Sequence, residues 1–319
     1  MVETRQNTLI GFICASTIVC LWSGWIVTTR SGATSALTAY DLAAMRFGIS
    51  GLLALPLVLY FKPWRGMTLK RVLVVSQLAG IPYNLIVFTA FTLSPASHGG
   101  VFMNGILPMI TVLLGWVWLK QVPHRMQLAG SALILVGASL TLLGGGSGAT
   151  TAETLTGDLL FMLAGLFFAM YMIATRLWGV TSMQVLFCAS VVNGVLYLPV
   201  WAVALPSGLT EASWSEIGLQ ALYQGVLATL FGMVLVAAAV RHIGAPVTAA
   251  MMSGVPAIAA LLGIRLLGEP MTTAGWISIL VLTPGIILTA TFNRDTRSAP
   301  PPVQAKKSPG EPGLEDKIT

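Results

Sequence analysis

The sequence has 319 residues, of which 55% are hydrophobic and only 9% are charged. A soluble domain carries roughly 25% charged residues, so this composition excludes an ordinary water-soluble protein. The net charge of +6 does not indicate nucleic-acid binding, because the basic residues lie in short connectors and a C-terminal tail. The three cysteines, Cys14, Cys20 and Cys188, lie in apolar stretches without CxxC spacing and predict packing residues rather than a metal site.

Ten long apolar stretches follow one another along the chain, and each reaches the roughly 20 residues that a membrane-spanning helix needs. The first five expected spans are Leu9–Thr29, Tyr40–Phe61, Val72–Leu93, Ser97–Leu119 and Gln127–Leu143. The second five are Asp158–Arg176, Met183–Leu205, Ile217–Val240, Ala245–Leu267 and Ala274–Phe292. The stretches are continuous rather than alternating, which favours helices, since a helix satisfies its own backbone hydrogen bonds in lipid. The first stretch exceeds the roughly 7–15 apolar residues of a signal peptide, so we expect it to be retained.

Lysine and arginine predict the orientation of the spans. With the N-terminus in the cytoplasm, fourteen of the 17 Lys and Arg residues fall on the cytoplasmic side. Arg30 and Arg265 fall on the outer side, and Arg46 lies within a span. This asymmetry follows the positive-inside rule. We therefore expect cytoplasmic termini in a bacterial plasma (inner) membrane, with residues 293–319 as a disordered cytoplasmic tail because they are rich in Pro, Lys, Glu and Gly.

An internal repeat appears when the sequence is shifted by 148 residues against itself. Pro108 then meets Pro256, and Gly115 meets Gly263, within a run of matched positions. Each repeat holds five helices, an odd number, so the second repeat enters the membrane from the opposite side. The predicted fold is an all-α integral membrane protein of ten transmembrane helices in two inverted five-helix repeats, residues 1–147 and 148–292. Inverted repeats are typical of transporters, because two such halves can exchange conformations.

Three short motifs add a family resemblance. They are Leu21-Trp22-Ser23-Gly24-Trp25 in span one, Ala43-Ala44-Met45-Arg46-Phe47 in span two, and Pro256 followed by Leu266-Leu267-Gly268-Glu269-Pro270 at the end of span nine. Over about residues 8–292 the chain resembles the ten-helix permeases of the drug/metabolite transporter (DMT) superfamily, EamA type. The resemblance implies efflux or exchange of small metabolites, amino acids or drugs.

The sequence departs from that family pattern after span four. The family usually has an acidic turn there, whereas this chain has Gln121 at the position that aligns with Glu269. The substitution argues against a mechanism that needs a carboxylate after span four, and it weakens the case for Glu269 as a coupling residue.

Arg46 is the main candidate for substrate binding. It lies about a turn and a half inside span two, where an unpaired charge is costly, so ionisable residues there are functional candidates. Arg46 could hold a substrate carboxylate or pair with a helix end. The alternative is a side chain that reaches the outer interface or makes a structural hydrogen bond.

Other ionisable residues near the ends of spans have simpler interpretations. Thr38 and Asp41 have the spacing of a capping box at a helix start. Glu269 precedes Pro270, and the pair suits a cap or a turn at the N-terminus of helix ten. His98 and Glu269 are possible proton-coupling residues, but the place of His98 near the start of span four favours an interfacial histidine.

Further candidates are aromatic or polar residues inside the spans, which we expect to face the interior of the bundle. The expected cavity residues, besides Arg46, are Trp22, Trp25, Tyr83, Asn84, Asn104, Tyr171, Asn193, Tyr223 and Gln224. Each residue alone has a packing role as its alternative. Pro108 and Pro256, at matched points of spans four and nine, are candidate gates or hinges.

The sequence therefore predicts a secondary transporter that moves a small organic metabolite, such as an amino acid or a drug-like compound, by alternating access. We expect no cofactor, no metal, no catalytic residue and no enzymatic activity, and a monomer or homodimer in the lipid bilayer. Because no GxxxxGK[ST] motif is present, the chain is not expected to hydrolyse ATP. The alternatives are a membrane-embedded enzyme, which would need clustered His, Asp, Glu or Cys, or a scaffold without transport.

Overall fold

The computed structural model describes residues 2–145 and 151–292. Ten helical segments in these parts are long and apolar enough to cross a membrane. All ten expected spans are confirmed, with ends that differ by a few residues. The spans are Thr8–Ala33, Ala39–Phe61, Leu69–Leu93, Ala96–Leu119, Arg125–Leu143, Ala152–Leu177, Ser182–Ala204, Trp214–Ile243, Val247–Leu267 and Thr273–Thr291. The expected tail, residues 293–319, lies outside the described residues.

Most spans consist of more than one helical element. Those of the first half are α1 (Val2–Ala33), α2 (Ala39–Phe61), the 3-10 helix η1 (Pro63–Gly66), α3 (Leu69–Leu78), α4 (Ile81–Leu93), α5 (Ala96–Gly99), the π-helix η2 (Gly100–Gly105), α6 (Leu107–Leu119), α7 (Arg125–Leu140) and the π-helix η3 (Thr141–Gly145). Those of the second half are α8 (Ala152–Leu177), α9 (Ser182–Leu186), the π-helix η4 (Phe187–Val192), α10 (Asn193–Ala204), α11 (Trp214–Gln220), the π-helix η5 (Ala221–Phe231), α12 (Gly232–Ile243), α13 (Ala245–Met252), α14 (Val255–Leu262), the π-helix η6 (Gly263–Leu267) and α15 (Thr273–Thr291).

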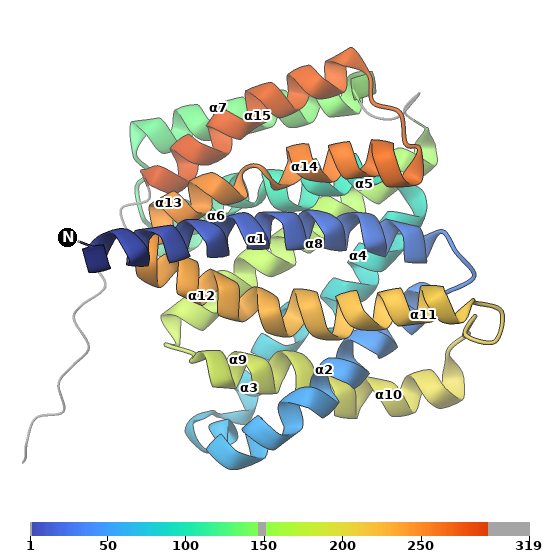
Figure 1. The fold of residues 1–319 in the computed structure, drawn as a ribbon. Coiled ribbons are helices and arrows are strands. Elements are labelled where there is room, and N and C mark those ends of the chain that lie inside the picture. The colour runs from blue at the N-terminus through green and yellow to red at the C-terminus, as the bar shows by residue number, and fades with distance from the viewer. Residues whose placement is uncertain (1, 146–150, 293–319) are drawn as a thin grey trace, which may run out of the picture.

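Helices α7 and α15 lie side by side along one edge of the bundle (Figure 1). Their contact depends on glycine, because a Cβ on Gly130 would lie 2.7 Å from the carbonyl of Gly285, and one on Gly285 would lie 2.8 Å from that of Gly130. Ser278 Oγ donates to the carbonyl of Gly137 at 2.5 Å. Small residues let the two backbones approach, and hydroxyl groups then bridge the helices, as is usual within membranes.

The third span is interrupted at Gly80, between α3 and α4. Asn193 of the second half closes this break, because its Nδ2 donates to the carbonyl of Ser76 at 3.1 Å and its Oδ1 accepts the N–H of Ile81 at 3.3 Å. Asn84 Nδ2 donates to the carbonyl of Gly80 at 2.8 Å. A broken helix is tolerated inside a membrane only where other groups satisfy its free backbone atoms, and these two asparagines do so.

The start of α2 follows the expected capping box. Thr38 accepts from the N–H of Asp41, and the Asp41 carboxylate accepts from the N–H of Thr38. Asp41 also accepts from the indole of Trp201 at 3.0 Å and from the N–H of Gly208 at 2.9 Å. The same carboxylate therefore caps its own helix and fixes α10 and the following connector to it.

Candidate functional site

A partly polar opening of the bundle lies at the end where α6, α8 and α15 finish and α7 begins. It is a cavity of about 540 Å³. We call this end of the bundle the Gln121 end. The lining residues are Leu107, Pro108, Thr111, Val112, Gly115, Leu119, Gln121, Val122, Pro123, Gln127, Met172, Ile173, Arg176, Leu177, Ala249, Thr289 and Ala290. Its walls come from both halves of the chain, and its size suits a small organic molecule.

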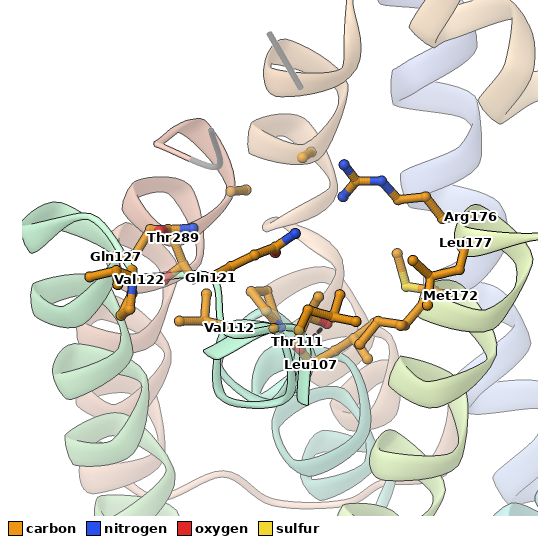
Figure 2. A pocket seen from close by; sticks show the side chains of 17 residues that line it. Leu107, Thr111, Val112, Gln121, Val122, Gln127, Met172, Arg176, Leu177 and Thr289 are labelled. Carbon is orange, nitrogen blue, oxygen red and sulfur yellow. Dashed lines mark hydrogen bonds between the residues drawn. The ribbon is translucent and has the colours of Figure 1, made fainter. Parts of the chain in front are cut away.

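Gln121 and Arg176 reach into this cavity from its two sides (Figure 2). Gln121 follows α6 and is exposed, and Arg176 lies in the last turn of α8. The cavity therefore offers an amide and a guanidinium group above apolar walls. Among the residues proposed from the sequence as a cavity lining or hinge, only Pro108 is part of it.

The opposite end of the bundle, which we call the Glu269 end, is closed by an ion pair between the two halves. Arg30 Nε donates to Glu269 Oε1 at 2.9 Å, and the two side chains are 19% and 15% exposed. Glu269 Oε2 accepts the N–H of Ala96, at the start of α5, at 2.9 Å. Arg30 Nη1 also donates to the carbonyl of Phe91 at the end of α4. One carboxylate thus holds α1, α4 and α5 together.

The expected cap of helix ten by Glu269 is wrong, whereas the alternative, a place in the turn before that helix, agrees with the structure. Helix α15 begins only at Thr273, and the side chain of Thr272 caps it by accepting the N–H of Gly275 at 3.2 Å. Because Thr272 already fills the capping position, Glu269 is left to cap a different helix, α5. Sequence spacing identified a capping carboxylate but assigned it to the wrong helix.

Glu269 and Gln121 occupy the same backbone turn in the two repeats. Glu269 N–H donates to the carbonyl of Gly263 at 3.2 Å, and Gln121 N–H donates to the carbonyl of Gly115 at 3.0 Å. The preceding residues, Gly268 and Lys120, are both left-handed, with φ of 65° and 58°. The turn is conserved between the repeats, so the two ends differ in the side chain that the turn presents.

Aromatic rings pack beneath the ion pair at the Glu269 end. Phe91 contacts Phe161 edge-on with centroids 4.7 Å apart, and it contacts Trp25 edge-on at 6.3 Å. Phe91 and Phe161 are fully buried. Rings in this edge-to-face geometry attract one another beyond their burial, so this layer blocks the Glu269 end below the ion pair.

A buried histidine–carboxylate pair lies beside this closure. His98 Nδ1 is 2.8 Å from Asp158 Oδ1 and 2.9 Å from Oδ2, and His98 is only 3% exposed. The interfacial position expected for His98 is therefore wrong, because Asp158 of α8 supplies a polar partner inside the bundle. Sequence reasoning missed Asp158. Its signal was a carboxylate at the edge of an apolar segment, where charged residues are functional candidates.

A central polar cluster joins α1, α2, α11 and η5 and is made of Trp25, Thr29, Arg46, Gln220 and Gln224. Gln224 Oε1 accepts from Trp25 Nε1 at 2.7 Å and from Arg46 Nη1 at 3.3 Å. Its Nε2 donates to Thr29 Oγ1 at 2.9 Å. The Arg46 guanidinium lies over the Trp25 ring, 5.5 Å from the centroid. Of the residues expected to line a cavity, the structure thus brings Trp25, Arg46 and Gln224 together.

The remaining candidates lie at helix contacts. Tyr83 donates to Met103 Sδ at 3.7 Å and packs on Phe168, which also contacts Tyr171. The Tyr223 hydroxyl lies 2.7 Å from the position that a Cβ on Gly24 would occupy, so Tyr223 fits against the bare backbone of α1.

The roles expected of four other candidates remain predictions. Trp22 packs against Gly232 of α12, and Asn104 is partly buried in η2. Pro108 and Pro256 each lie in the first turn of a new helical segment, α6 and α14. The two prolines therefore follow matched interruptions of spans four and nine.

The fold and this site define an integral membrane protein with a central cluster, one closed end and one open end. The sequence profile of the EamA-like transporter family matches residues 9–143 and again residues 155–291. The chain belongs to this family, and each match covers one five-helix repeat.

Two further comparisons found similar proteins. The uncharacterized transporter YwfM of Bacillus subtilis (strain 168) is 24% identical over 220 residues, which cover 68% of this chain and 72% of YwfM. A solved crystal structure of another protein aligns with a TM-score of 0.59 and 20% identity, covering 92% of this chain and 99% of that one. This structural likeness shows the shared fold.

Proposed function

We propose that the protein is a secondary transporter for a small organic metabolite that carries a carboxylate, such as an amino acid or an acidic drug-like compound. The observation that carries this proposal is the state of Arg46. Within residues 2–145 and 151–292 no carboxylate lies within ion-pair distance of Arg46. Its guanidinium has five N–H donors, of which one makes a hydrogen bond to another described side chain. A charge inside a membrane span calls for a partner, and a substrate carboxylate supplies one.

The surroundings of Arg46 favour recognition of an organic carboxylate. The Trp25 ring and Gln224 hold the guanidinium in place, and Gln224 is itself held by Thr29. A fixed, planar guanidinium binds a carboxylate through two parallel hydrogen bonds. Neighbouring aromatic residues, among them Trp22 and Tyr223, offer apolar surface to the rest of such a molecule.

The difference between the two ends supports alternating access as the mechanism. The Glu269 end is closed and the Gln121 end holds a cavity, whereas the repeats have opposite topology. If the two halves exchange conformations, the Gln121 end closes and the Glu269 end opens. The interrupted helices at Pro108 and Pro256 are the proposed hinges of that exchange.

The distribution of Lys and Arg supports an orientation. With the Gln121 end in the cytoplasm, Arg176, Arg125 and Lys120 lie on the cytoplasmic side, as the positive-inside rule requires. The structure then corresponds to an inward-open state of a protein in a bacterial inner membrane. We propose a monomer or homodimer that needs no cofactor.

Exchange assays in proteoliposomes test the proposed function. Vesicles loaded with an unlabelled compound would be given a trace of the same labelled compound, over a panel of amino acids, other small carboxylates and amines that lack a carboxylate. We expect saturable exchange of carboxylates, loss of exchange in Arg46→Met, and partial retention in Arg46→Lys, which keeps the charge but not the planar fork. Arg125→Met, at the exposed start of α7, is the matched control and should exchange normally. Normal exchange and affinity in Arg46→Met would refute the assignment of the site.

A further inference from the structure

A buried, hydrogen-bonded cluster consists of Ser94, His98 and Asp158. It connects the end of α4 and the short helix α5 with α8, beside the closed Glu269 end. Asp158 is fully buried, and His98 and Ser94 are 3% and 0% exposed. The mechanism proposed above makes no use of these groups.

The hydrogen bonds of this cluster need more protons than its groups ordinarily carry. There are three links: from His98 Nδ1 to Asp158 at 2.8 Å, from Ser94 Oγ to Asp158 Oδ1 at 2.8 Å, and from Ser94 Oγ to the carbonyl of Thr154 at 2.7 Å. Each link is of full hydrogen-bond length and needs one hydrogen. Neutral histidine brings one to Nδ1 and the serine hydroxyl brings one, whereas an ionised aspartate brings none.

A third proton completes the cluster. The carbonyl of Thr154 can only accept, so it takes the hydroxyl hydrogen of Ser94. Ser94 Oγ then has only lone pairs to offer to Asp158 Oδ1, and the link between them exists when Asp158 carries a proton and donates it. Asp158 Oδ2 remains free to accept from His98 Nδ1, 2.9 Å away. All three links are then satisfied.

The position of the added proton follows from the other ring nitrogen. Within the described residues, His98 Nε2 has no hydrogen-bond partner. A proton there would create a buried cationic N–H without an acceptor, which is more costly than a lone pair without a donor. The proton therefore resides on Asp158, and His98 remains neutral with its hydrogen on Nδ1.

We propose that Asp158, together with His98 and Ser94, is a proton-binding site whose occupation stabilises the closed Glu269 end. This inference deepens the proposed transport function and names a regulating ligand, the proton, for the same conformational exchange. In the closed state the cluster is shielded from water. When the Glu269 end opens, water solvates Asp158 and the proton leaves.

The charged groups that approach the cluster from other elements do not replace this proton. Arg30 of α1 and Glu269 before α15 are paired with each other and reach the start of α5 through Ala96, two residues from His98. Glu153, in the first turn of α8, is exposed. Among the described residues, no Lys or Arg side chain therefore forms an ion pair with Asp158.

The direction of the pH effect follows from linkage. The closed state binds one proton more than the open state, so low pH favours closing and rising pH favours opening. One linked proton changes the equilibrium by at most roughly tenfold per pH unit.

The first test observes the proton directly. Infrared spectroscopy of the full-length protein in lipid nanodiscs would record the C=O stretch of protonated carboxyl groups at neutral pH, without any substrate. We expect such a band in the unsubstituted protein and in Glu153→Gln, the control on the same helix, and we expect its loss in Asp158→Asn. Absence of a protonated carboxyl band at neutral pH, or its survival in Asp158→Asn, would overturn the proposal.

The second test links the proton to the opening of the Glu269 end. Ala259 is fully buried at that end, so the rate at which a thiol reagent modifies Ala259→Cys, in a chain whose native cysteines are replaced by alanine, reports opening. Because the thiolate is the reacting species, the rate is divided at each pH by that of Glu211→Cys, an exposed reference position. We expect this relative rate to rise severalfold from about pH 6 to pH 8 in the otherwise unsubstituted chain. The relative rate should stay low at every pH in Asp158→Asn, which resembles the protonated state in shape and hydrogen bonding.

A histidine control separates the site from a general effect of pH. His98→Gln should weaken the pH dependence of labelling, whereas His242→Gln, near the end of α12, should retain it. An unchanged pH dependence in Asp158→Asn would overturn the proposal. Neither test requires transport, so failure of the exchange assay and failure of the proton site are distinguishable.

Discussion

The two ends of this transporter have the same backbone turn, but one end is closed and the other holds an open cavity. At the Glu269 end the carboxylate pairs with Arg30 and caps α5. At the Gln121 end the matched residue is a neutral amide that lines an open cavity. The comparison teaches that the inverted repeat keeps the turn, whereas the side chain presented by the turn differs between the closed end and the open end.

The largest expected effect comes from breaking the ion pair. In Glu269→Gln, Arg30 loses its counter-charge and Ala96 N–H loses a charged acceptor. We expect a loss of about 1–3 kcal/mol in the stability of the closed end, between the values for exposed and fully buried pairs. Thermal unfolding in detergent and thiol labelling of Ala259→Cys would measure it. Glu153→Gln is the control, and equal behaviour of the two variants would contradict the role given to Glu269.

A steric change at the Glu269 end, Gly157→Ala, should lower the stability of the protein somewhat less than Glu269→Gln does. A Cβ on Gly157 would lie 2.6 Å from Ser94 Oγ and 2.8 Å from its Cβ, so Gly157→Ala must push α4 and α8 apart. Overpacking of this kind lowers stability by about 1–3 kcal/mol. The higher helix propensity of alanine over glycine offsets roughly 1 kcal/mol of that loss. Gly218→Ala, where a Cβ has no neighbour within 4 Å, should leave the melting temperature unchanged or raise it. A Gly157→Ala protein as stable as Gly218→Ala would show that the contact between α4 and α8 is loose.

A carboxylate at position 121 would make the Gln121 end more like the Glu269 end. It should shift the equilibrium between the open and closed states of the Gln121 end. In Gln121→Glu the new carboxylate faces Arg176 across the cavity (Figure 2), and a partly solvated pair of this kind contributes about 0.2–1 kcal/mol. We expect the Gln121 end to close more often and labelling of Thr111→Cys to slow by up to roughly fivefold at low salt. Gln121→Met, which adds no charge, is the control. Faster labelling of Thr111→Cys in Gln121→Glu would contradict the expected closing of the Gln121 end.

The smallest effect concerns the turn itself. Lys120 has a left-handed backbone with φ of 58°, where its repeat partner is Gly268 with φ of 65°. Glycine adopts this conformation without strain but loses more entropy on folding. Lys120→Gly should therefore stabilise the protein by roughly 0.5 kcal/mol, and Gly268→Ala should destabilise it by about 1 kcal/mol. Denaturation midpoints of the two variants should move in opposite directions, and a shift in the same direction would refute the equivalence of the turns.

The sequence was sufficient for features that depend on local pattern. The ten spans follow from apolar length, and the capping box of Thr38 and Asp41 follows from a spacing of three residues. The shift by 148 residues also predicts that Gln121 corresponds to Glu269, and their shared backbone turn confirms it.

Contacts between distant parts of the chain were not predictable in this way. Arg30 and Glu269 are separated by 239 residues, and His98 and Asp158 by 60. Nothing in a single sequence specifies which of several polar residues meet across helices. Asp158 was not among the predicted site residues, because it lies at the edge of an apolar segment, where a carboxylate is typical of a helix N-terminus. The cavity at the Gln121 end was missed because its polar lining, including Gln127 and Arg176, lies at the ends of spans.

The most direct test of the difference between the ends compares two positions related by the repeat. Thr111 lines the cavity at the Gln121 end, and Ala259, 148 residues on, is fully buried at the Glu269 end. Thiol labelling of Thr111→Cys and Ala259→Cys would be compared in nanodiscs, where both faces are reachable, in a chain without Cys14, Cys20 and Cys188. The account predicts fast labelling at Thr111→Cys and slow labelling at Ala259→Cys, and the addition of Glu269→Gln should raise the second rate and lower the first. Equal rates at the two positions, or rates that ignore Glu269→Gln, would contradict it.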